Sequence, residues 1–520
     1  MAELELLDLT ALHIAAIHGQ QDTIRNLVEA GAVIDATAED GWTPLHLAAR
    51  YGHNSAVVEL LDNGSNMYLK RFIDLTPFHE AAKWGHLEVV KTFVNRGMDC
   101  NVKNCMGTTP LHEAVANNHK DVALYLLEIG ADVNVTCSLD FTPLYFAAQE
   151  GNISIVKALI WRGADVTLNN TLYVASCEGH VNVVAELLSS GALVNGKNEI
   201  SRTPLHAAAV NGHCSVMQLL LEYGSEVNLV DNSGLSALHL AASKGHAHAV
   251  SMLLKNHAKV NLVDINNQSA LHFVAIGGCY KTYVYLIDFS ACVNISDINL
   301  FTPLHLACKH GHVDIVKGLI SHGALVNSTN RDLHTPLHIA AENNQVKVME
   351  ILVKSTDLDV LNIDGRTALH IASLKGYCSV VETLISAGAD LSLCDKDGNT
   401  ALHLGSKHLS IITALINKEV NIDCRNADDQ TPLHLASIQG YVGGVNALLE
   451  KGAKVNVTDS HQNTSLHYAV KYNQFGIVKA LIEHDAQLGL LNSDGNSPLL
   501  LATSKGLRKV ANLLLSHGAD

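Results

Sequence analysis

Histidine is the residue of this chain with the greatest potential for chemistry, because it is the usual general base and a frequent zinc ligand in proteins. The 520-residue sequence contains 30 histidines. Most of them are periodic and fall into two groups. The first follows a Thr-Pro-Leu-like tripeptide, and the second follows a glycine or its substitute. The first group lies at positions 13, 46, 79, 112, 206, 239, 272, 305, 338, 370, 403, 434 and 467, and the second at 53, 86, 119, 180, 213, 246 and 312.

Neither group of histidines has the spacing of a metal site. His46 and His53 lie seven residues apart, which is about 10 Å along a helix. Equivalent histidines on stacked helices would be separated by roughly 8–10 Å, whereas two nitrogens that share one zinc ion lie far closer. We therefore predict that these imidazoles bond to the backbone between neighbouring repeats, and we assign no metal ligand.

The other signals for chemistry are equally weak. The eleven cysteines are scattered and never form Cys-x-x-Cys, so they predict neither a disulfide framework nor a zinc ribbon, and we expect reduced thiols. The sequence has no Gly-x-x-x-x-Gly-Lys-Ser/Thr phosphate loop, no His-Glu-x-x-His and no Gly-x-Ser-x-Gly. It therefore predicts no catalytic residue and no cofactor.

The periodic histidines belong to a longer unit, of which residues 302–312, Thr-Pro-Leu-His-Leu-Ala-Cys-Lys-His-Gly-His, are a clear copy. Copies recur along the whole chain, mostly thirty-three residues apart, and all nine prolines directly follow the leading Thr position. That position, called the Thr slot below, falls at residues 10, 43, 76, 109, 142, 170, 203, 236, 269, 302, 335, 367, 400, 431, 464 and 497. The sequence therefore contains about sixteen repeats.

The residue pattern of each repeat predicts a pair of helices. Thr302 can cap a first helix with its hydroxyl, and Pro303 at the first helical position lacks only an amide that would have no partner there. Gly311 can end this helix because it tolerates a positive φ. An apolar stripe from Val313 to about His322 then predicts a second helix. Because neither short helix can bury its stripe alone, the pairs must stack on one another.

Thr-Pro-Leu-His-Leu-Ala, a following Gly-His and Gly-Ala, and the period of thirty-three residues together resemble the ankyrin repeat. The resemblance covers essentially all 520 residues. It implies an all-α solenoid of helix-turn-helix units with short β-hairpin fingers, stacked into a curve. It also implies that the chain binds other proteins. Since no linker-like composition interrupts the repeats, we expect residues 1–520 to form a single continuous array.

Three places depart from the period. The finger is shortened near residues 166–170, and the repeats are irregular near 354–367 and 400–431. We expect the sixth repeat, with Asn170 and Thr171 at the cap, and the thirteenth, with Gly405 in the first helix, to be the least stable.

Charge and hydropathy restrict the possible partners. Lys and Arg total 35 against 51 Asp and Glu, which gives a formal net charge of −16. Nucleic acid is therefore an unexpected partner, and a protein with a basic or extended segment is easier to accommodate. No apolar run is long enough to span a membrane, so we expect no membrane insertion and a cytoplasmic location.

The candidate binding residues occupy positions that the stack would leave free. These are the finger position before the Thr slot and the two positions before the glycine of the first helix, which line the concave side in this architecture. Large aromatic residues concentrate there in repeats two to five, as expected for an interface, although they could instead pack against neighbouring fingers. Trp161 is expected to pack on the far side of a second helix. The candidates are Trp42, Arg50, Tyr51, Leu75, Lys83, Trp84, Asn117, Phe141, Gln149, Glu150 and Phe301.

Two functional hypotheses follow. The first is a non-catalytic protein-protein interaction scaffold or adaptor, which binds partners along its concave face and finger tips. The second is the substrate-recognition arm of a larger assembly, such as a ubiquitin-ligase adaptor, a tether for a membrane protein or channel, or a secreted effector. Partner identity separates the two hypotheses.

Overall fold

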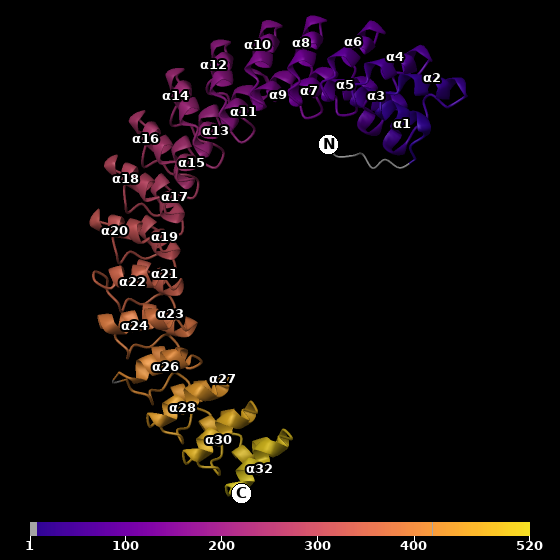
Figure 1. Cartoon of the computed structure of the whole chain (residues 1–520). Coiled ribbons are helices and arrows are strands. Elements are labelled where there is room, and N and C mark those ends of the chain that lie inside the picture. The colour runs from indigo at the N-terminus through magenta and orange to yellow at the C-terminus, as the bar shows by residue number, and fades with distance from the viewer. Residues whose placement is uncertain (1–7, 419) are drawn as a thin grey trace. The chain divides into compact units, whose positions relative to one another are not determined.

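The computed structural model describes residues 8–418 and 420–520, which form α-helices α1 to α32 in consecutive pairs (Figure 1). They divide into two compact units, Met1–Lys259 (unit 1) and Val260–Asp520 (unit 2). The helices of unit 1 are α1 (Ala11–Ile17), α2 (Gln21–Glu29), α3 (Pro44–Arg50), α4 (Asn54–Asp62), α5 (Pro77–Lys83), α6 (Leu87–Asn95), α7 (Pro110–Ala116), α8 (Lys120–Glu128), α9 (Pro143–Gln149), α10 (Ile153–Trp161), α11 (Thr171–Glu178), α12 (Val181–Ser189), α13 (Pro204–Asn211), α14 (Cys214–Glu222), α15 (Ala237–Ser243) and α16 (Ala247–Lys255).

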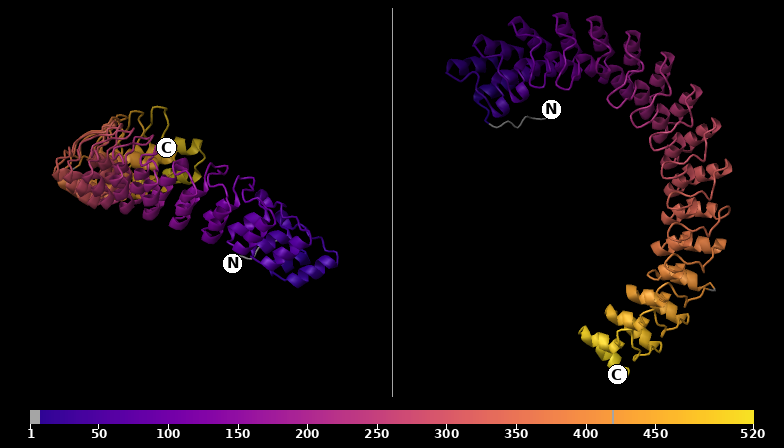
Figure 2. Two further views of the ribbon diagram at one scale, coloured as in Figure 1. Left: turned by 90° about the horizontal axis from the view of Figure 1, so that it is seen from above. Right: turned by 180° about the vertical axis from the view of Figure 1, so that it is seen from behind.

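Unit 2 repeats the same arrangement. Its helices are α17 (Ala270–Gly277), α18 (Tyr280–Asp288), α19 (Pro303–His310), α20 (Val313–Ser321), α21 (Pro336–Glu342), α22 (Val346–Leu352), α23 (Ala368–Lys375), α24 (Cys378–Ala387), α25 (Ala401–Leu404), α26 (Leu409–Ile416), α27 (Pro432–Gln439), α28 (Val442–Glu450), α29 (Ser465–Lys471), α30 (Phe475–Glu483), α31 (Pro498–Ser504) and α32 (Arg508–Ser516). Within each unit the pairs follow one another side by side, in both views of Figure 2.

The helix boundaries agree with the cap chemistry that the sequence predicts. In α19 the Thr302 side chain caps the amide of His305, and the Thr302 amide donates back to His305 Nδ1 at 3.2 Å. Gly311 ends the helix in the left-handed region with φ 75°. The second helix, α20, then buries Ile315, Val316 and Leu319. The predicted helix pair is therefore confirmed.

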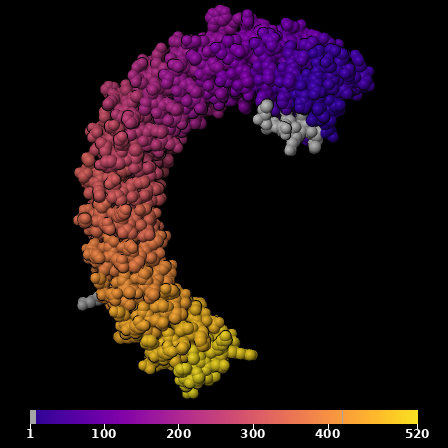
Figure 3. All heavy atoms as spheres, in the orientation of Figure 1, coloured from indigo at the N-terminus to yellow at the C-terminus, as the bar shows by residue number. Residues whose placement is uncertain are grey.

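The pairs stack through like helices. First helices contact first helices, such as α3 with α5 and α19 with α21, and second helices contact second helices, such as α22 with α24. The residues buried at these contacts on the first helices are small, for example Ala48 and Ala49. Small side chains allow a close approach, and the space-filling view shows neighbouring pairs in direct contact within each unit (Figure 3).

The periodic histidines connect the pairs, as predicted. His46 Nε2 lies 3.0 Å from the carbonyl oxygen of Leu75 in the following repeat. His53 Nε2 lies 2.9 Å from the carbonyl oxygen of Ile17 in the preceding repeat. The first histidine group thus bonds forward and the second bonds backward. Among the described residues, no group of three or more His, Cys, Asp or Glu side chains is placed to hold a metal ion.

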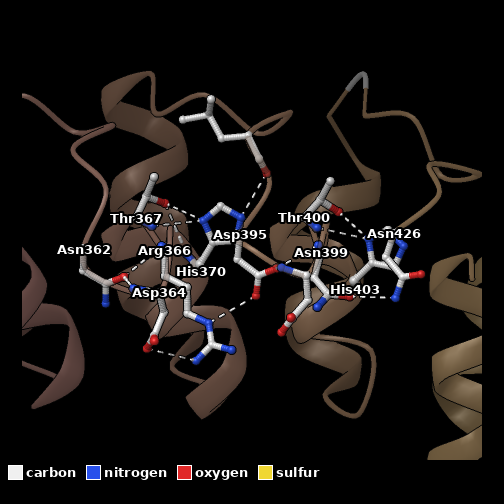
Figure 4. Close-up of polar contacts among 12 residues, drawn as sticks. Asn362, Asp364, Arg366, Thr367, His370, Asp395, Asn399, Thr400, His403 and Asn426 are labelled. Atoms are coloured by element: carbon white, nitrogen blue, oxygen red, sulfur yellow. Dashed lines mark hydrogen bonds and ion pairs between the residues drawn. The ribbon is translucent and has the colours of Figure 1, made fainter. Parts of the chain in front are cut away.

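The fingers differ from the expected β-hairpins. In the described part of the chain they contain isolated bridges, such as Val230 with Ser236, but no strand. In one such finger the Asp395 amide donates to the Asn399 carbonyl and the Gly398 amide donates to the Asp395 carbonyl, each at 2.9 Å. The Asp395 carboxylate then accepts the amides of Asp397 and Asn399 at 3.1 and 2.8 Å, so the finger is an Asx turn (Figure 4).

The irregular repeats also have distinct structures. Where five finger residues are missing, a 3-10 helix, Leu168–Asn170, leads directly into α11. The N-cap Asn170 has φ 53° and its side chain makes no cap hydrogen bond. In the thirteenth repeat α25 has only 4 residues. A Cβ atom at Gly405 would meet the Ile411 side chain, so the chain turns early and closely into α26.

Candidate protein-binding surface

The predicted site residues of repeats two to five lie on one surface of unit 1. It is formed by α3, α5, α7 and α9 and by the fingers before them, and is called the first-helix face below. Trp84 is 43% exposed there, but Trp42 is only 3% exposed and Leu75 is also buried. The expectation that Trp42 and Leu75 are exposed is therefore wrong. Of the other candidates, Asn117, Gln149 and Glu150 are exposed, and Arg50, Tyr51, Lys83, Phe141 and, in unit 2, Phe301 are half-buried.

Trp42 is buried because the next finger covers the position before the Thr slot. The guanidinium carbon of Arg71, in that next finger, lies 4.0 Å from the centre of the Trp42 ring. The edge of His46 contacts the same ring from its own helix. Arg366 of unit 2 occupies the equivalent position, and its Nε lies 3.2 Å from the carboxylate of Asp395 in the following finger (Figure 4). This position is therefore a contact between fingers.

A buried carboxylate organises the surface beside Trp42. Glu80 in α5 is completely buried, and both Nε and Nη2 of Arg71 donate to its Oε1, the first at 2.8 Å. Trp84 Nε1 donates to Oε2 at 3.2 Å, and Arg50 Nη1 lies 3.7 Å from the same oxygen. A buried carboxylate is costly unless it is paired and hydrogen-bonded, and these three partners satisfy both conditions. We call Trp42, Arg50, Arg71, Glu80 and Trp84 the Trp–Arg cluster.

Arg50 lies close to both indoles of this cluster. Its guanidinium carbon is 5.4 Å from the centre of the Trp42 ring and 4.3 Å from that of Trp84. Cation–π contacts of this kind hold a guanidinium in place. The side chain is only 18% exposed. In the described part of the chain its nitrogens make no hydrogen bond, so several donors remain available.

Glu113 occupies the position in the following repeat that is equivalent to that of Glu80. Its carboxylate accepts the Thr108 hydroxyl at 3.1 Å. Burial raises the pKa of Glu113, while the nearby Lys83 ammonium and the Thr108 hydrogen bond oppose this rise. The surface near Trp84 thus carries two cations, Arg50 and Lys83, beside two carboxylates.

The aromatic residues continue into the fifth repeat. Phe141 stacks on Tyr145 with ring centres 4.0 Å apart and planes 9° apart. Phe146 meets both rings edge-on, at 6.1 Å from Phe141 and 5.7 Å from Tyr145. Phe141 is therefore one member of an aromatic group rather than a single projecting anchor.

Sequence reasoning missed four residues of this surface, namely Arg71, Glu80, Tyr145 and Phe146. A signal for Glu80 was present, because repeats usually carry an apolar residue directly after the motif histidine, as Leu47 and Leu240 do. The sequence also led us to expect that Trp161 is a packing residue, but its side chain is 77% exposed at the end of α10. Arg71 gave no such signal, since finger residues vary freely.

The whole arrangement offers aromatic faces and hydrogen-bond donors, which are features of a binding surface. Among the described helices, none is long and apolar enough to cross a membrane. A search of curated proteins finds no match to this chain. Models of ankyrin repeats, described as three copies, match residues 2–71, 69–137, 172–264, 238–330, 324–393, 375–459 and 456–520, and a many-copy model matches 117–160. The matches cover nearly the whole length, and the described helix pairs have the same period. The chain therefore belongs to the ankyrin repeat family.

Proposed function

We propose that this chain is a non-catalytic interaction scaffold or adaptor that binds an extended segment of a partner protein on the first-helix face of repeats two to five. Ankyrin repeats are typical protein-interaction modules, and the family match supports this general role. The observation that carries the specific location is the half-exposed Trp84, held next to Arg50. Tryptophan and arginine are the residues most enriched among the energetic centres of protein interfaces.

The neighbourhood of Trp84 supports the same location. Trp84 is fixed by its hydrogen bond to Glu80 and by Arg50 over its ring. A side chain that is already ordered loses little conformational entropy on binding. The adjacent Lys83, Asn117 and Gln149 could supply a polar rim around it.

The free cysteines are relevant to the cellular compartment in which the protein works. We propose that the protein works in the cytoplasm, because its cysteines are scattered rather than grouped for bridges, and reduced thiols are normal there.

Comparison of the tryptophans tests the binding surface. Wild-type protein, Trp84→Ala and Trp161→Ala would be used as bait to capture partners from a cell lysate, and the captured proteins would be identified and titrated. Trp161 is a matched control, because it is also exposed but lies outside the first-helix face. We expect Trp84→Ala to weaken binding by about 2 kcal/mol with little change in melting temperature, and Trp161→Ala to bind normally.

Trp42→Ala should behave differently, since this ring is buried. We expect it to lose about 3–5 kcal/mol of local stability, as large-to-small substitutions in a core do. Normal binding by Trp84→Ala together with weakened binding by Trp161→Ala would place the interface on the second helices and contradict the proposal.

A further inference from the structure

Arg50 is the one charged member of the Trp–Arg cluster whose side chain makes no hydrogen bond within the described structure. Arg71 directs two nitrogens to Glu80, and Trp84 directs its indole nitrogen to the same carboxylate. Arg50 contributes only a longer ionic contact at 3.7 Å. The Arg50 nitrogens are not among the buried side-chain atoms that lack a partner, so they reach solvent and are accessible to a ligand.

We propose that Arg50 binds a carboxylate of the partner segment, either an Asp or Glu side chain or a chain terminus. This inference rests on the proposed function and specifies its chemistry. The planar guanidinium presents paired N–H groups that match the two oxygens of a carboxylate. The Trp42 and Trp84 rings already lie close to the guanidinium, so the receptor is formed before the partner arrives.

The charge balance of the cluster favours an anion over a cation at this point. Glu80 is neutralised by Arg71, which makes two hydrogen bonds to it. Arg50 is therefore the surplus charge of the cluster, and Lys83, next to Trp84 in the chain, interacts electrostatically with Glu113. A basic side chain placed here would face the Arg50 guanidinium, whereas a carboxylate would find a partly desolvated guanidinium, where charge-assisted hydrogen bonds are strong.

The surroundings also limit the number of carboxylates. Glu113 lies close by, and the whole chain has a formal net charge of −16. A run of acidic residues would be repelled by this background. The exposed face of Trp84 next to Arg50 offers contact area for an apolar side chain. The partner segment that fits is thus one isolated Asp or Glu with an apolar neighbour, in a sequence that is otherwise neutral or basic.

A random peptide library displayed on phage provides the test, with binders selected on the complete wild-type chain. Parallel selections would use Arg50→Gln, Arg50→Lys and the control Lys309→Gln. Lys309 occupies the same helical position in α19 and is exposed, but no tryptophan stacks on it. Melting temperatures of all variants would be compared first, so that loss of folding is recognised.

We expect peptides selected on wild type to be enriched in a single Asp or Glu beside an apolar residue. Replacing that acid by its amide should weaken binding to wild type by about tenfold or more, equivalent to about 1.4 kcal/mol. The same replacement should have little effect on Arg50→Gln, and Arg50→Lys should bind weakly because it loses the paired geometry. Lys309→Gln should select the same peptides as wild type.

The outcomes separate this inference from the proposed function. Peptides that depend on Trp84 but show no acidic enrichment, or that bind Arg50→Gln equally well, would overturn the carboxylate inference and leave the binding surface in place. Peptides that bind Trp84→Ala and Arg50→Gln as well as wild type, or a selection that yields no binders, would overturn both. The peptide-side Asp→Asn comparison on wild-type protein requires no protein variant, so a folding defect cannot obscure it.

Discussion

Histidine in this chain works as a neutral hydrogen-bonding group between repeats. His79 illustrates the role, since its Nδ1 receives the Thr76 amide at 3.3 Å and its Nε2 bonds to the Thr108 carbonyl at 3.2 Å. An imidazole that accepts at one nitrogen and donates at the other must be neutral. Burial lowers the pKa of His46 to about 3 and that of His79 and His112 to about 4.

These pKa shifts predict loss of stability in mild acid. In the unfolded chain these three histidines take up protons near pH 6.5, whereas in the folded chain they do so only near pH 4 or below. The unfolded state therefore binds more protons between these values, and stability falls as the pH is lowered through this window. Each histidine contributes up to about 1.4 kcal/mol per pH unit. The effect is measured by denaturant unfolding at a series of pH values from about 7.5 to about 5, the range in which the histidines of the unfolded chain become protonated.

The control for this prediction comes from the chain itself, because Tyr145 naturally takes the histidine position in the fifth repeat. His112→Tyr should therefore reduce the slope of stability against pH, whatever its effect on absolute stability. A free energy of unfolding that stays constant down to pH 5 would contradict the neutral-histidine model.

The glycine before the second helix is fixed by two constraints at once. Gly212 has φ 73°, and a Cβ atom there would lie 2.8 Å from His246 Nδ1 of the next repeat. Gly224 has φ 84° but nothing within 4 Å of such an atom. We expect Gly224→Ala to cost about 1–2 kcal/mol from backbone strain alone, and Gly212→Ala to cost clearly more. Chemical denaturation of the two variants makes the comparison, and equal losses would mean that the histidine simply moves aside.

For individual residues, sequence patterns predicted the roles of those that recur from repeat to repeat and missed the roles of residues that occur in one repeat only. The cap threonines and the periodic histidines follow from spacing. The burial of Trp42 does not, because it depends on Arg71 in the next finger, at a position where residues vary. The pairing of Arg71 with Glu80 likewise depends on a long flexible side chain, whose direction no periodicity indicates.

At the scale of helices, one core contact shows how neighbouring repeats adapt to each other. Tyr283 of α18 takes a position where other second helices carry valine, such as Val250 and Val316, and it is nevertheless fully buried. Space for its ring is provided by Gly318 of α20, where a Cβ atom would lie 2.6 Å from Tyr283 Cε1. The hydroxyl lies 3.1 Å from His322 Nδ1, and burial raises the pKa of Tyr283 to about 12.

This pair gives a prediction for α20. Gly318→Ala should destabilise unit 2 by about 1–3 kcal/mol through overpacking, although alanine normally favours a helix. Combining it with Tyr283→Val should recover much of the loss, because the second change removes the ring. A double-mutant cycle in denaturant measures the coupling. Additive effects of the two substitutions would show that the two sites do not share this space.

The finger tips carry a second local feature. The residue two positions before the Thr slot is left-handed, and it is Gly365, Gly398 or Asn267 in several repeats. Leu333 takes this position with φ 58° while remaining 46% exposed. A leucine there strains the backbone and gains little from burial, so Leu333→Asn should stabilise unit 2 by about 1 kcal/mol. A higher melting temperature checks this, and Leu391→Asn, in a finger position without positive φ, provides the comparison.

An unchanged or lower melting temperature for Leu333→Asn would show that the exposed leucine contributes packing that outweighs the strain.

At this scale the sequence predicted the helix pairs well, because cap, stripe and glycine agree in each repeat. It predicted β-hairpin fingers less well, since the described fingers contain only isolated bridges and turns such as the Asx turn at Asp395.

For the whole molecule, the period of thirty-three residues is sufficient to predict the family and the all-α fold, both of which are confirmed. A repeat protein has no single core, so its stability is a sum of terms from each repeat and from each contact between neighbours. Weak repeats within the array are therefore expected to open without unfolding the rest of it.

The thirteenth repeat is the place where such opening should be easiest to detect. Its first helix, α25, has only 4 residues, compared with 8 in α19, so it offers fewer backbone hydrogen bonds and a smaller surface to α23 and α27. The sixth repeat should also open readily, because the Asn170 side chain makes no cap hydrogen bond, a loss worth about 1 kcal/mol. Amide hydrogen exchange followed by mass spectrometry measures the protection of each helix. We expect α25 and α26 to exchange faster than α19 and α20, and α11 faster than α13. The helices compared with each other belong to the same unit in each case, so a difference in stability between the two units does not affect the comparison. Exchange as slow in α25 as in α19 would mean that the contacts of α26 with α28 compensate for the short helix and that the repeats are more strongly coupled than a nearest-neighbour sum allows.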